Sequence, residues 1–328
     1  MITDKRENIL SVVMAFSDIK GIGQVAIRTY EDYFMAVENE DDAYQLYKEI
    51  KESIYNKSKA WGSRIPDLTP DELNEKIHNA QKTLEEQTKK GIYSVFFADD
   101  FYKKLFEKDL TFQSHTNPPL YFFYKGNKNA LEKRGIAIVN AYLKEEWALK
   151  ISRIFGKYTA QKGWNLIIDS QDTVEVENSN CIFIQESPLE EMENTDFCDA
   201  VLKNDGCIVS LVWKDKNKII YAAGIVEFQI ALAKGIFAFG YHKNYFFNGE
   251  ERKEETIEEE KRVYFNLLKG TRKRYQRHPV ACYYCYGDEQ SMKANNDLIA
   301  GGGIYGLNID KSRWNMGTFL KLCEDRLK

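Results

Sequence analysis

The chain has 328 residues, of which 43% are hydrophobic, and this length is enough for two or three compact units with a sizeable core. Its net charge of −4 and pI near 5.8 exclude a uniformly basic nucleic-acid-binding protein but leave a local basic patch possible. No apolar run approaches the roughly 20 residues that span a bilayer, and residues 1–7 lack the apolar core of a signal peptide. The six cysteines are scattered, unlike a disulfide framework. We therefore expect a soluble, cytoplasmic protein without a membrane partner.

The first 90 residues predict a helical N-terminal domain. Apolar residues favour a buried helix at 9–16 and amphipathic helices at 24–34, 41–57 and 71–90. Thr69 is placed to cap the last helix, with Pro70 at its first position. Gly21-Ile22-Gly23 separates the first two helices as in a helix-hairpin-helix or SAM-like domain, whose turn amides can meet a nucleic-acid phosphate. A tight interhelical turn is the simpler interpretation, which we favour.

From residue 91 onward, short apolar runs alternate with helical segments. We expect strands at residues 92–97, 136–140, 164–169, 181–185, 207–213 and 236–240, and helices at 99–107, 144–162, 189–203 and 219–234. This alternation predicts right-handed crossovers and an α/β fold with a doubly wound, mostly parallel, Rossmann-like sheet. The predicted sheet domain covers residues 91–310, and residues 311–328 form a C-terminal helix. Ligands of such sheets bind beyond the carboxyl ends of the strands.

Residues 241–295 form a charged insertion within the predicted sheet domain. An acidic stretch at 250–261 is followed by a basic cluster at 269–277. The cluster consists of Lys269, Arg272, Lys273, Arg274, Tyr275 and Arg277. Its cations could meet phosphates while tyrosines stack on bases, so it is our candidate nucleic-acid-binding site. The alternative is a solvated helix that pairs with the acidic stretch, or a protein interface.

Five motifs occur along the chain in an order that resembles a known family. They are Ile19-Lys20-Gly21-Ile22-Gly23, Pro118-Pro119-Leu120-Tyr121 with Lys125-Gly126-Asn127, the strand at 135–140, the helix-to-strand passage at 231–240, and Asn296-Asp297-Leu298-Ile299 followed by Gly302. Together they resemble the DNA-processing A (DprA, also called Smf) family. The resemblance implies a Rossmann-like variant that binds single-stranded DNA and hands it to the RecA recombinase during DNA uptake. It implies no cofactor, and we also expect a homodimer.

Two loops depart from the pattern of that family. The family follows its first strand with Gly-Ser-Arg, where this chain has Asn140-Ala141-Tyr142. After the second strand, a glycine-rich family loop is replaced by residues 169–175, which include Asp169, Ser170 and Asp172. Glycines let backbone amides approach a phosphate, whereas carboxylates repel it. We therefore expect Asn140, Tyr142, Asp169, Ser170 and Asp172 to line a ligand pocket that has changed its role, and DNA to bind at the basic cluster instead.

The acidic loop offers an alternative chemistry. Asp169, Asp172 and Glu175 could hold Mg²⁺ or act as acid and base, although a polar loop is the simpler interpretation. Gly224 and Glu227 match part of the motif of the lonely-guy nucleotide phosphoribohydrolases, without its threonine, and a surface glutamate explains them more simply. We predict no catalytic residue, with Asp169 and Glu227 as the acids of the alternative, a nucleotide sensor or hydrolase.

Cys282 and Cys285 have the spacing of metal ligands, with His278 four residues earlier. A zinc site needs four ligands, and the further candidates are His242 and Cys323. A single pair without its partner pair is a weak signal, so we predict no metal and keep this set as the alternative. The sequence thus favours a non-enzymatic DNA-binding protein. An interaction protein in a defence or toxin–antitoxin system is a third possibility.

Overall fold

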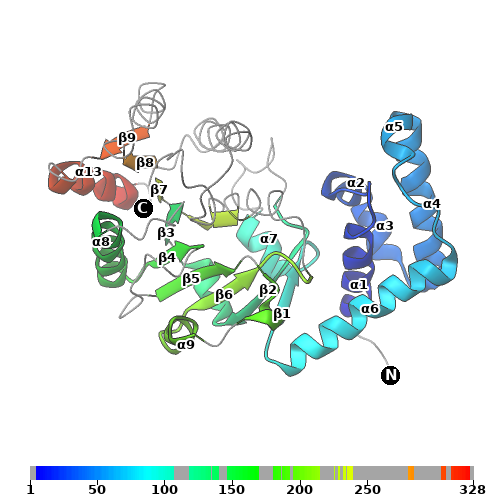
Figure 1. The fold of residues 1–328 in the computed structure, drawn as a ribbon, viewed down its shortest axis with the longest axis horizontal. Helices are drawn as coiled ribbons and strands as arrows, with labels where there is room; N and C mark the ends of the chain where they lie inside the picture. The colour runs from blue at the N-terminus through cyan, green and yellow to red at the C-terminus, as the bar shows by residue number, and fades with distance from the viewer. Residues whose placement is uncertain are drawn as a thin grey trace. The chain divides into compact units, whose positions relative to one another are not determined.

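The computed structural model describes residues 5–106, 118–133, 135–139, 146–169, 180–185, 187–192, 195–214, 225, 228–229, 232–233, 235–238, 280–283, 304–307 and 312–325. The chain divides into two compact units (Figure 1), one comprising residues 1–103 and 119–122, the other residues 104–118 and 123–328. Within the described ranges, no helix combines the length and apolarity needed to cross a bilayer.

The N-terminal unit is built around a buried helix. Its helices are α1 (Lys5–Ser17), α2 (Gln24–Thr29), α3 (Glu31–Ala36), α4 (Glu40–Lys57), α5 (Lys59–Gly62) and α6 (Pro70–Lys89). Every residue of α1 from Ile9 to Phe16 is buried, as its apolar run predicts. The Phe16 ring packs edge-on against Phe34 of α3 and Tyr47 of α4, with centroid distances of 5.0 and 6.3 Å. Aromatic contacts therefore join three helices into one core.

Capping side chains explain where the longer helices begin. Asn39 caps α4 and Thr69 caps α6, and in both cases an acidic side chain three residues later closes a capping box. Pro70 occupies the first position of α6, as the sequence predicts. One prediction was wrong, because the single helix expected at 24–34 is divided into α2 and α3. The division falls at Tyr30, whose φ of −109° and ψ of 23° interrupt the helical geometry.

The N-terminal unit also contains strand β1 (Tyr93–Phe96) and the first two residues of β2 (Tyr121–Gly126). The Phe97 backbone amide donates to the Leu120 carbonyl at 3.0 Å, which places the Pro-Pro-Leu-Tyr motif beside β1. The Tyr121 hydroxyl lies 2.8 Å from the Ser17 hydroxyl at the end of α1. This part of the motif therefore ties a strand to the helical core.

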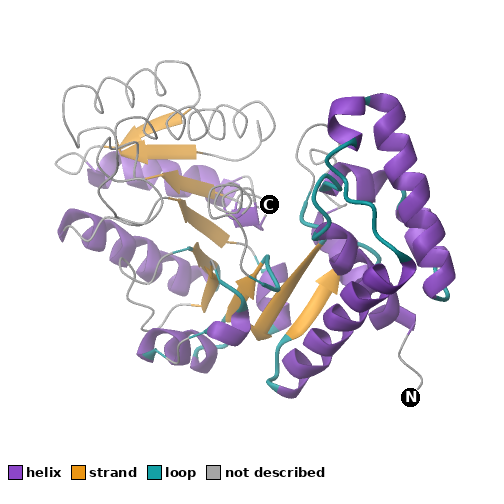
Figure 2. Ribbon diagram, turned by 45° about the vertical axis from the view of Figure 1, so that its right-hand side comes forward, coloured by secondary structure: helices purple, strands orange, loops and turns teal. Residues whose placement is uncertain are grey.

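The second unit is a mostly parallel sheet (Figure 2, strands in orange). Its further strands are β3 (Gly135–Val139), β4 (Asn165–Ile168), β5 (Asn180–Gln185), β6 (Cys207–Ser210), β7 (Gly235–Ala238), β8 (Val280–Tyr283) and β9 (Ile304–Leu307). The strand order from β2 is β2-β6-β5-β4-β3-β7-β8-β9, with β2 antiparallel to β6 and all neighbours from β6 to β9 parallel. The direction of winding changes between β3 and β7. The predicted doubly wound sheet is confirmed.

Helices and short turns lie between the strands or follow the last of them. They include α7 (Asp100–Phe106), α8 (Glu146–Lys162), α9 (Asp196–Lys203), α13 (Ser312–Asp325) and the 3₁₀ helices η2 (Lys128–Glu132) and η3 (Leu189–Glu191). The helices α8 and α13 pack together through Phe155 and Phe319, whose ring centroids are 6.1 Å apart. The Tyr158 hydroxyl donates to the Glu324 carboxylate, which also pairs with Lys162 at 2.6 Å. The C-terminal helix is thereby held against α8.

The structure corrects three further element predictions. The helix expected at 189–203 is η3 followed by α9, because Thr195 caps a new helix by accepting from the Cys198 amide at 3.2 Å. The strand expected at 207–213 ends at Ser210. The strands β8 and β9 were not predicted, and β8 lies inside the segment expected to be a charged insertion, where it pairs with β7. Pro279 directly before β8 and Gly306 within β9 weaken the strand signal of these two segments.

Free cysteines contribute to the core around β5 and β6. Cys181, Cys198 and Cys207 are all buried thiols. Burial raises the pKa of Cys181, with smaller contributions from Cys207 and Cys198, and burial also raises the pKa of Cys207. Thiols with a raised pKa are poor nucleophiles and poor metal ligands. Cys181 and Cys207 therefore act as small apolar packing groups.

Candidate functional site at the carboxyl edge of the sheet

The parallel strands end together at one edge of the sheet. Ile168 of β4 lies opposite Phe183 of β5, and Gln185 lies opposite Ser210 of β6. On the other side, Val139 of β3 pairs with Ala238 of β7, across the point where the winding changes direction. Ligands of doubly wound sheets bind at this edge and at this switch point. The side chains that follow the strands here define the candidate site.

The ends of β5 and β6 use their polar side chains to hold a loop of the protein. The Gln185 amide nitrogen donates to the Ser187 hydroxyl at 2.9 Å and to the Pro188 carbonyl at 3.0 Å. The Ser210 hydroxyl lies 2.9 Å from the Ser187 carbonyl and accepts from the Val212 amide at 3.2 Å. Both Gln185 and Ser210 are buried. At β5 and β6 the edge is therefore closed by internal hydrogen bonds.

Asp169 directly follows β4 and is the one member of the predicted ligand pocket that the structure describes. Its side chain is 5% exposed. Burying a carboxylate is costly unless its surroundings compensate the charge, so this position is a specific feature of the site. Asn140, Tyr142, Ser170 and Asp172 lie outside the described residues. The ligand pocket at these residues therefore stays a prediction.

A glutamine from the crossover before β7 reaches the end of β3. Gln229 is fully buried, and its amide nitrogen donates to the Ile138 carbonyl at 3.2 Å. The neighbouring Ile225 and Phe228 are also buried, so this crossover turns an apolar face toward the core. Glu227, the second acid of the alternative hydrolase, lies outside the described residues. No sequence pattern selects Gln229, because a polar residue in an amphipathic helix is expected to face water.

Trp213 and Lys214 follow β6 and were also not predicted as site residues. Trp213 is buried, and its indole nitrogen has no hydrogen-bond partner among the described residues. The Lys214 ammonium lies over the Trp213 ring, 4.7 Å from its centroid. An aromatic residue beside a lysine directly after a buried strand was the sequence signal that could have indicated these residues.

The Lys-Gly-Asn motif after β2 has a structural role. Gly126 has a φ of +103°, and a Cβ placed there would lie 2.6 Å from the Gly206 carbonyl oxygen. The Asn127 amide donates to that same oxygen at 2.9 Å, and the Asn127 side chain accepts from the Asn129 amide to begin η2. Only glycine accommodates both the conformation and the close approach. This motif therefore fixes the turn beside β6.

Gly21, in the other glycine motif, also has a structural role. Its φ is +90°, and an added Cβ would lie 2.8 Å from the side chain of Ile65. Ile19 and Ile22 on either side are buried. The helix that follows, α2, has only six residues. These contacts account for the turn without a ligand, while phosphate binding by its amides stays a prediction.

The remaining predicted site residues fall outside the described part of the chain. The basic cluster, comprising Lys269, Arg272, Lys273, Arg274, Tyr275 and Arg277, is among them. So are His278 and Cys285 of the alternative metal set, whereas the backbone of Cys282 lies in β8. The nucleic-acid and metal assignments at these positions therefore stay predictions.

A parallel sheet with a central switch point, joined to a helical N-terminal unit, defines a Rossmann-like α/β protein with an additional helical domain. Within this class, the chain has the fold of DNA processing protein A. The X-ray structure of that protein (DprA) from Streptococcus pneumoniae matches 97% of this chain and 98% of its own, with a TM-score of 0.60 and 12% sequence identity. The resemblance predicted from the five motifs is confirmed at the level of the fold.

Other comparisons are weaker. DNA processing protein A from Helicobacter pylori, described for its single-stranded DNA binding mode, matches 70% of this chain and 96% of its own at 15% identity, with a TM-score of 0.47. The molybdenum cofactor carrier protein of Chlamydomonas reinhardtii matches 58% of this chain and 98% of its own at 15% identity, with a TM-score of 0.33. No protein-family model and no curated protein sequence matches the chain.

Proposed function

We propose that this protein acts in DNA processing and binds single-stranded DNA. The observation that carries the proposal is the match with the DprA of Streptococcus pneumoniae, which extends over 97% of this chain and includes both units. At 12% identity a shared fold supports a function by analogy only. The order of the five motifs agrees with the same fold, in which Lys125-Gly126-Asn127 fixes the turn beside β6.

We place the DNA contact at the basic cluster rather than at the carboxyl edge. At that edge Gln185 and Ser210 are engaged by the protein's own loop, and Asp169 contributes a buried carboxylate. A phosphate entering this edge would find the Gln185 and Ser210 side chains already hydrogen-bonded to the protein. The cluster at 269–277 instead supplies five cations within nine residues. Phosphate neutralisation by such cations supplies most of the affinity of sequence-independent DNA binding.

An electrophoretic mobility shift with single- and double-stranded DNA across a salt series tests this proposal. We expect salt-sensitive binding that favours the single strand. Replacing Arg272, Lys273 and Arg274 together by glutamine should make the negative slope of log affinity against log salt shallower by about 2, at about 0.7 per lost phosphate contact. The matched control replaces Lys82, Lys89 and Lys90, three exposed lysines of the α6 region, by glutamine. Absence of salt-sensitive binding, or equal losses in both variants, would contradict the proposal.

Three further parts of the proposal rest on the family resemblance and on composition. They are delivery of the bound strand to a recombinase, assembly as a homodimer, and a cytoplasmic location. Light scattering of the purified protein measures the oligomeric state. A recombinase-loading assay on DNA coated with a single-strand-binding protein measures delivery. Each result is independent of the DNA-binding assay.

A second candidate function is a nucleotide-binding sensor or a nucleotide hydrolase. The observation that favours it is the burial of Asp169 at the carboxyl edge, where a nucleotide would bind in a Rossmann-like sheet. Nucleotide-dependent thermal stabilisation that is lost in Asp169→Asn, or release of free base from a nucleoside monophosphate, would support this function over DNA binding. Failure of both this assay and the DNA-binding assay would favour an interaction protein of a defence or toxin–antitoxin system.

A further inference from the structure

The N-terminal unit presents a group of aromatic and cationic side chains where α4 passes into α5. We call this group the elbow patch, and it consists of Tyr55, Lys57, Lys59, Trp61 and Arg64. Trp61 is 58% exposed and Tyr55 is 43% exposed, and both are among the most exposed large apolar side chains described. The Arg64 guanidinium lies over the Trp61 ring, 4.6 Å from its centroid. Tryptophan, tyrosine and arginine are the residues most enriched at binding hot spots, so this group is a candidate interaction surface.

The charge around the elbow patch differs from that of the preceding chain. Residues 53–66 contain no aspartate or glutamate, whereas residues 31–52 contain eight. Lys57, Lys59 and Arg64 are all exposed, and none forms an ion pair with another described residue. Their charges are therefore not neutralised within this part of the protein. The patch is locally suited to an anionic partner.

The segment that carries Trp61 is held in place at α5 by close backbone packing against α4. Helix α5 ends at Gly62, and a Cβ at this position would lie 2.3 Å from the Tyr55 Cα atom and 2.8 Å from the Tyr55 nitrogen. The helices α4 and α5 therefore touch backbone to backbone at this point. Ser58 connects them directly, since it ends α4 and precedes the first residue of α5. This contact fixes Trp61 relative to Tyr55.

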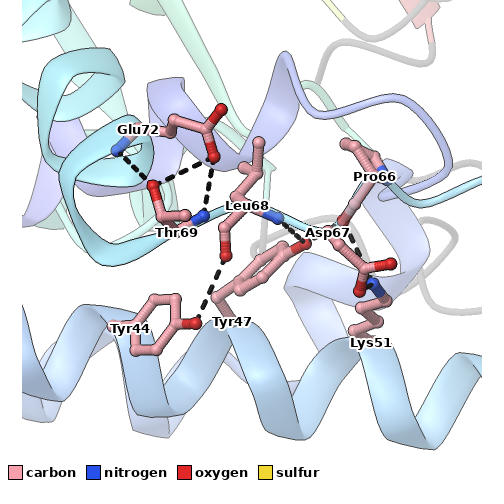
Figure 3. A network of polar contacts seen from close by, with 8 residues as sticks. All are labelled: Tyr44, Tyr47, Lys51, Pro66, Asp67, Leu68, Thr69 and Glu72. Carbon is pink, nitrogen blue, oxygen red and sulfur yellow. Dashed lines mark hydrogen bonds and ion pairs between the residues drawn. The ribbon is translucent and has the colours of Figure 1, made fainter.

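The chain that follows the segment, at residues 66–68, is held by the polar network in Figure 3. The Tyr47 hydroxyl donates to the Pro66 carbonyl and accepts from the Leu68 amide at 3.3 Å. The Tyr44 hydroxyl donates to the Leu68 carbonyl at 3.3 Å, and Lys51 pairs with Asp67. Since Tyr44, Tyr47 and Lys51 all belong to α4, the chain after Arg64 is anchored on the same helix. The exposed Trp61 is thus presented by a preorganised support, which lowers the entropic cost of binding.

We propose that the elbow patch is a binding site for single-stranded nucleic acid, in addition to the cluster at 269–277. A base stacks on Trp61, Arg64 contacts an adjacent phosphate or extends the stack, and Lys57 and Lys59 follow the backbone. This inference rests on the proposed function, because it assigns a second surface to the same ligand. A protein partner would also use Trp, Tyr and Arg, but lysine is depleted in protein interfaces. The two uncompensated lysines therefore favour a polyanion.

The first test measures binding of a fluorescein-labelled oligothymidine to the full chain by fluorescence anisotropy. We expect Trp61→Ala to weaken binding by about 5- to 20-fold, because base–aromatic stacking is lost, and Trp61→Phe to retain most of the affinity. The matched control is Tyr33→Ala. Tyr33 is 57% exposed on the same unit but is flanked by Glu31 and Asp32, so this variant should bind as the unchanged protein does. Thermal denaturation confirms that each variant is folded.

The second test separates the charge contribution from stacking. Replacing Lys57 and Lys59 by glutamine should make the negative slope of log affinity against log salt shallower by about 1.4, at about 0.7 per lost phosphate contact. Ultraviolet cross-linking of an iodouracil-substituted oligonucleotide, followed by peptide mapping, should then place a cross-link within residues 55–64. A cross-link at the elbow patch locates the strand independently of any effect of substitution on stability.

The possible outcomes distinguish this inference from the proposed function. If the unchanged protein binds the oligonucleotide but Trp61→Ala binds equally well and no cross-link falls in the patch, the elbow site is wrong while the DNA-binding function stands. If the unchanged protein does not bind single-stranded DNA, both proposals fail. If Trp61→Ala changes the oligomeric state in light scattering and leaves DNA affinity unaltered, the patch is a protein interface and the nucleic-acid assignment is overturned.

Discussion

The carboxyl edge of the sheet and the elbow patch differ in the exposure of their side chains. At the edge, Gln185 and Ser210 are buried and hydrogen-bonded to the protein's own loop. At the elbow, Trp61 and Arg64 are exposed while their backbone is fixed by Gly62 and by the network on α4. The usual ligand site of the fold is thus partly occupied by internal contacts. Position in a fold alone does not identify the surface that is available for binding.

The largest effect is expected from Gly62→Ala, which tests whether the elbow depends on backbone contact. The added methyl group would collide with Tyr55 backbone atoms, which cannot move without displacing α4. We expect the free energy of unfolding to fall by about 3 kcal/mol, as overpacked sites do. The control is Gly23→Ala, where no heavy atom lies within 4 Å of the new Cβ and the change should stay below about 1 kcal/mol. Urea denaturation measures the free energy of unfolding of both variants. Equal losses would show that α5 can shift to accommodate the added methyl group.

A smaller loss is expected from Ser210→Ala, which tests whether the sheet edge is closed. The substitution removes the acceptor of the buried Val212 amide and the contact with the Ser187 carbonyl. An unsatisfied buried amide should lower the free energy of unfolding by about 2 kcal/mol. The matched control is Ser63→Ala, because the exposed Ser63 hydroxyl contacts only the Ala60 carbonyl and its loss should cost less than about 0.5 kcal/mol. If the two variants were equally stable, the edge would not depend on this serine.

The smallest effect is expected from Tyr158→Phe, which tests the link between α8 and α13 through its pH dependence. Burial, and then the hydrogen bond and charge of Glu324, raise the pKa of Tyr158 above its ordinary value. A group with a raised pKa in the folded state stabilises the protein below its unfolded pKa, near pH 10 for tyrosine, and this stabilisation is lost as the pH rises further. At neutral pH the free energy of unfolding of the unchanged protein should be higher than that of the variant by about 1 kcal/mol, the usual contribution of one hydrogen bond. The difference should shrink in denaturation curves above about pH 10, and a constant difference would contradict the link.

The fold was largely predictable because its main signals are local. Apolar runs such as Ile136–Val139 end in polar residues, and caps such as Thr69 lie next to the helices they begin. The errors occurred where a short-range feature interrupts a long periodic segment. Tyr30 divides one predicted helix, and Thr195 starts α9 within another. The strands β8 and β9 were missed because Pro279 directly precedes one and Gly306 lies within the other, and both residue types weaken a strand signal.

The sites were less predictable because exposure is a tertiary property. Asp169 was assigned to the end of its strand, but the sequence did not show that its side chain is buried. Trp61 was overlooked, since tryptophan is highly buried on average, and α5 is only four residues long. Its exposure follows from the contact of Gly62 with Tyr55, two residues that no sequence pattern pairs.

Gly126 and Gly206 face each other across the turn beside β6, where a side chain on either would strike backbone atoms. A substitution at one position cannot be relieved by a change at the other, because the obstructing atoms are common to every amino acid. Distant relatives of this chain should therefore retain both glycines even where the surrounding residues have diverged completely. A search that weights this pair, together with Asn127, would find such relatives where overall sequence similarity fails.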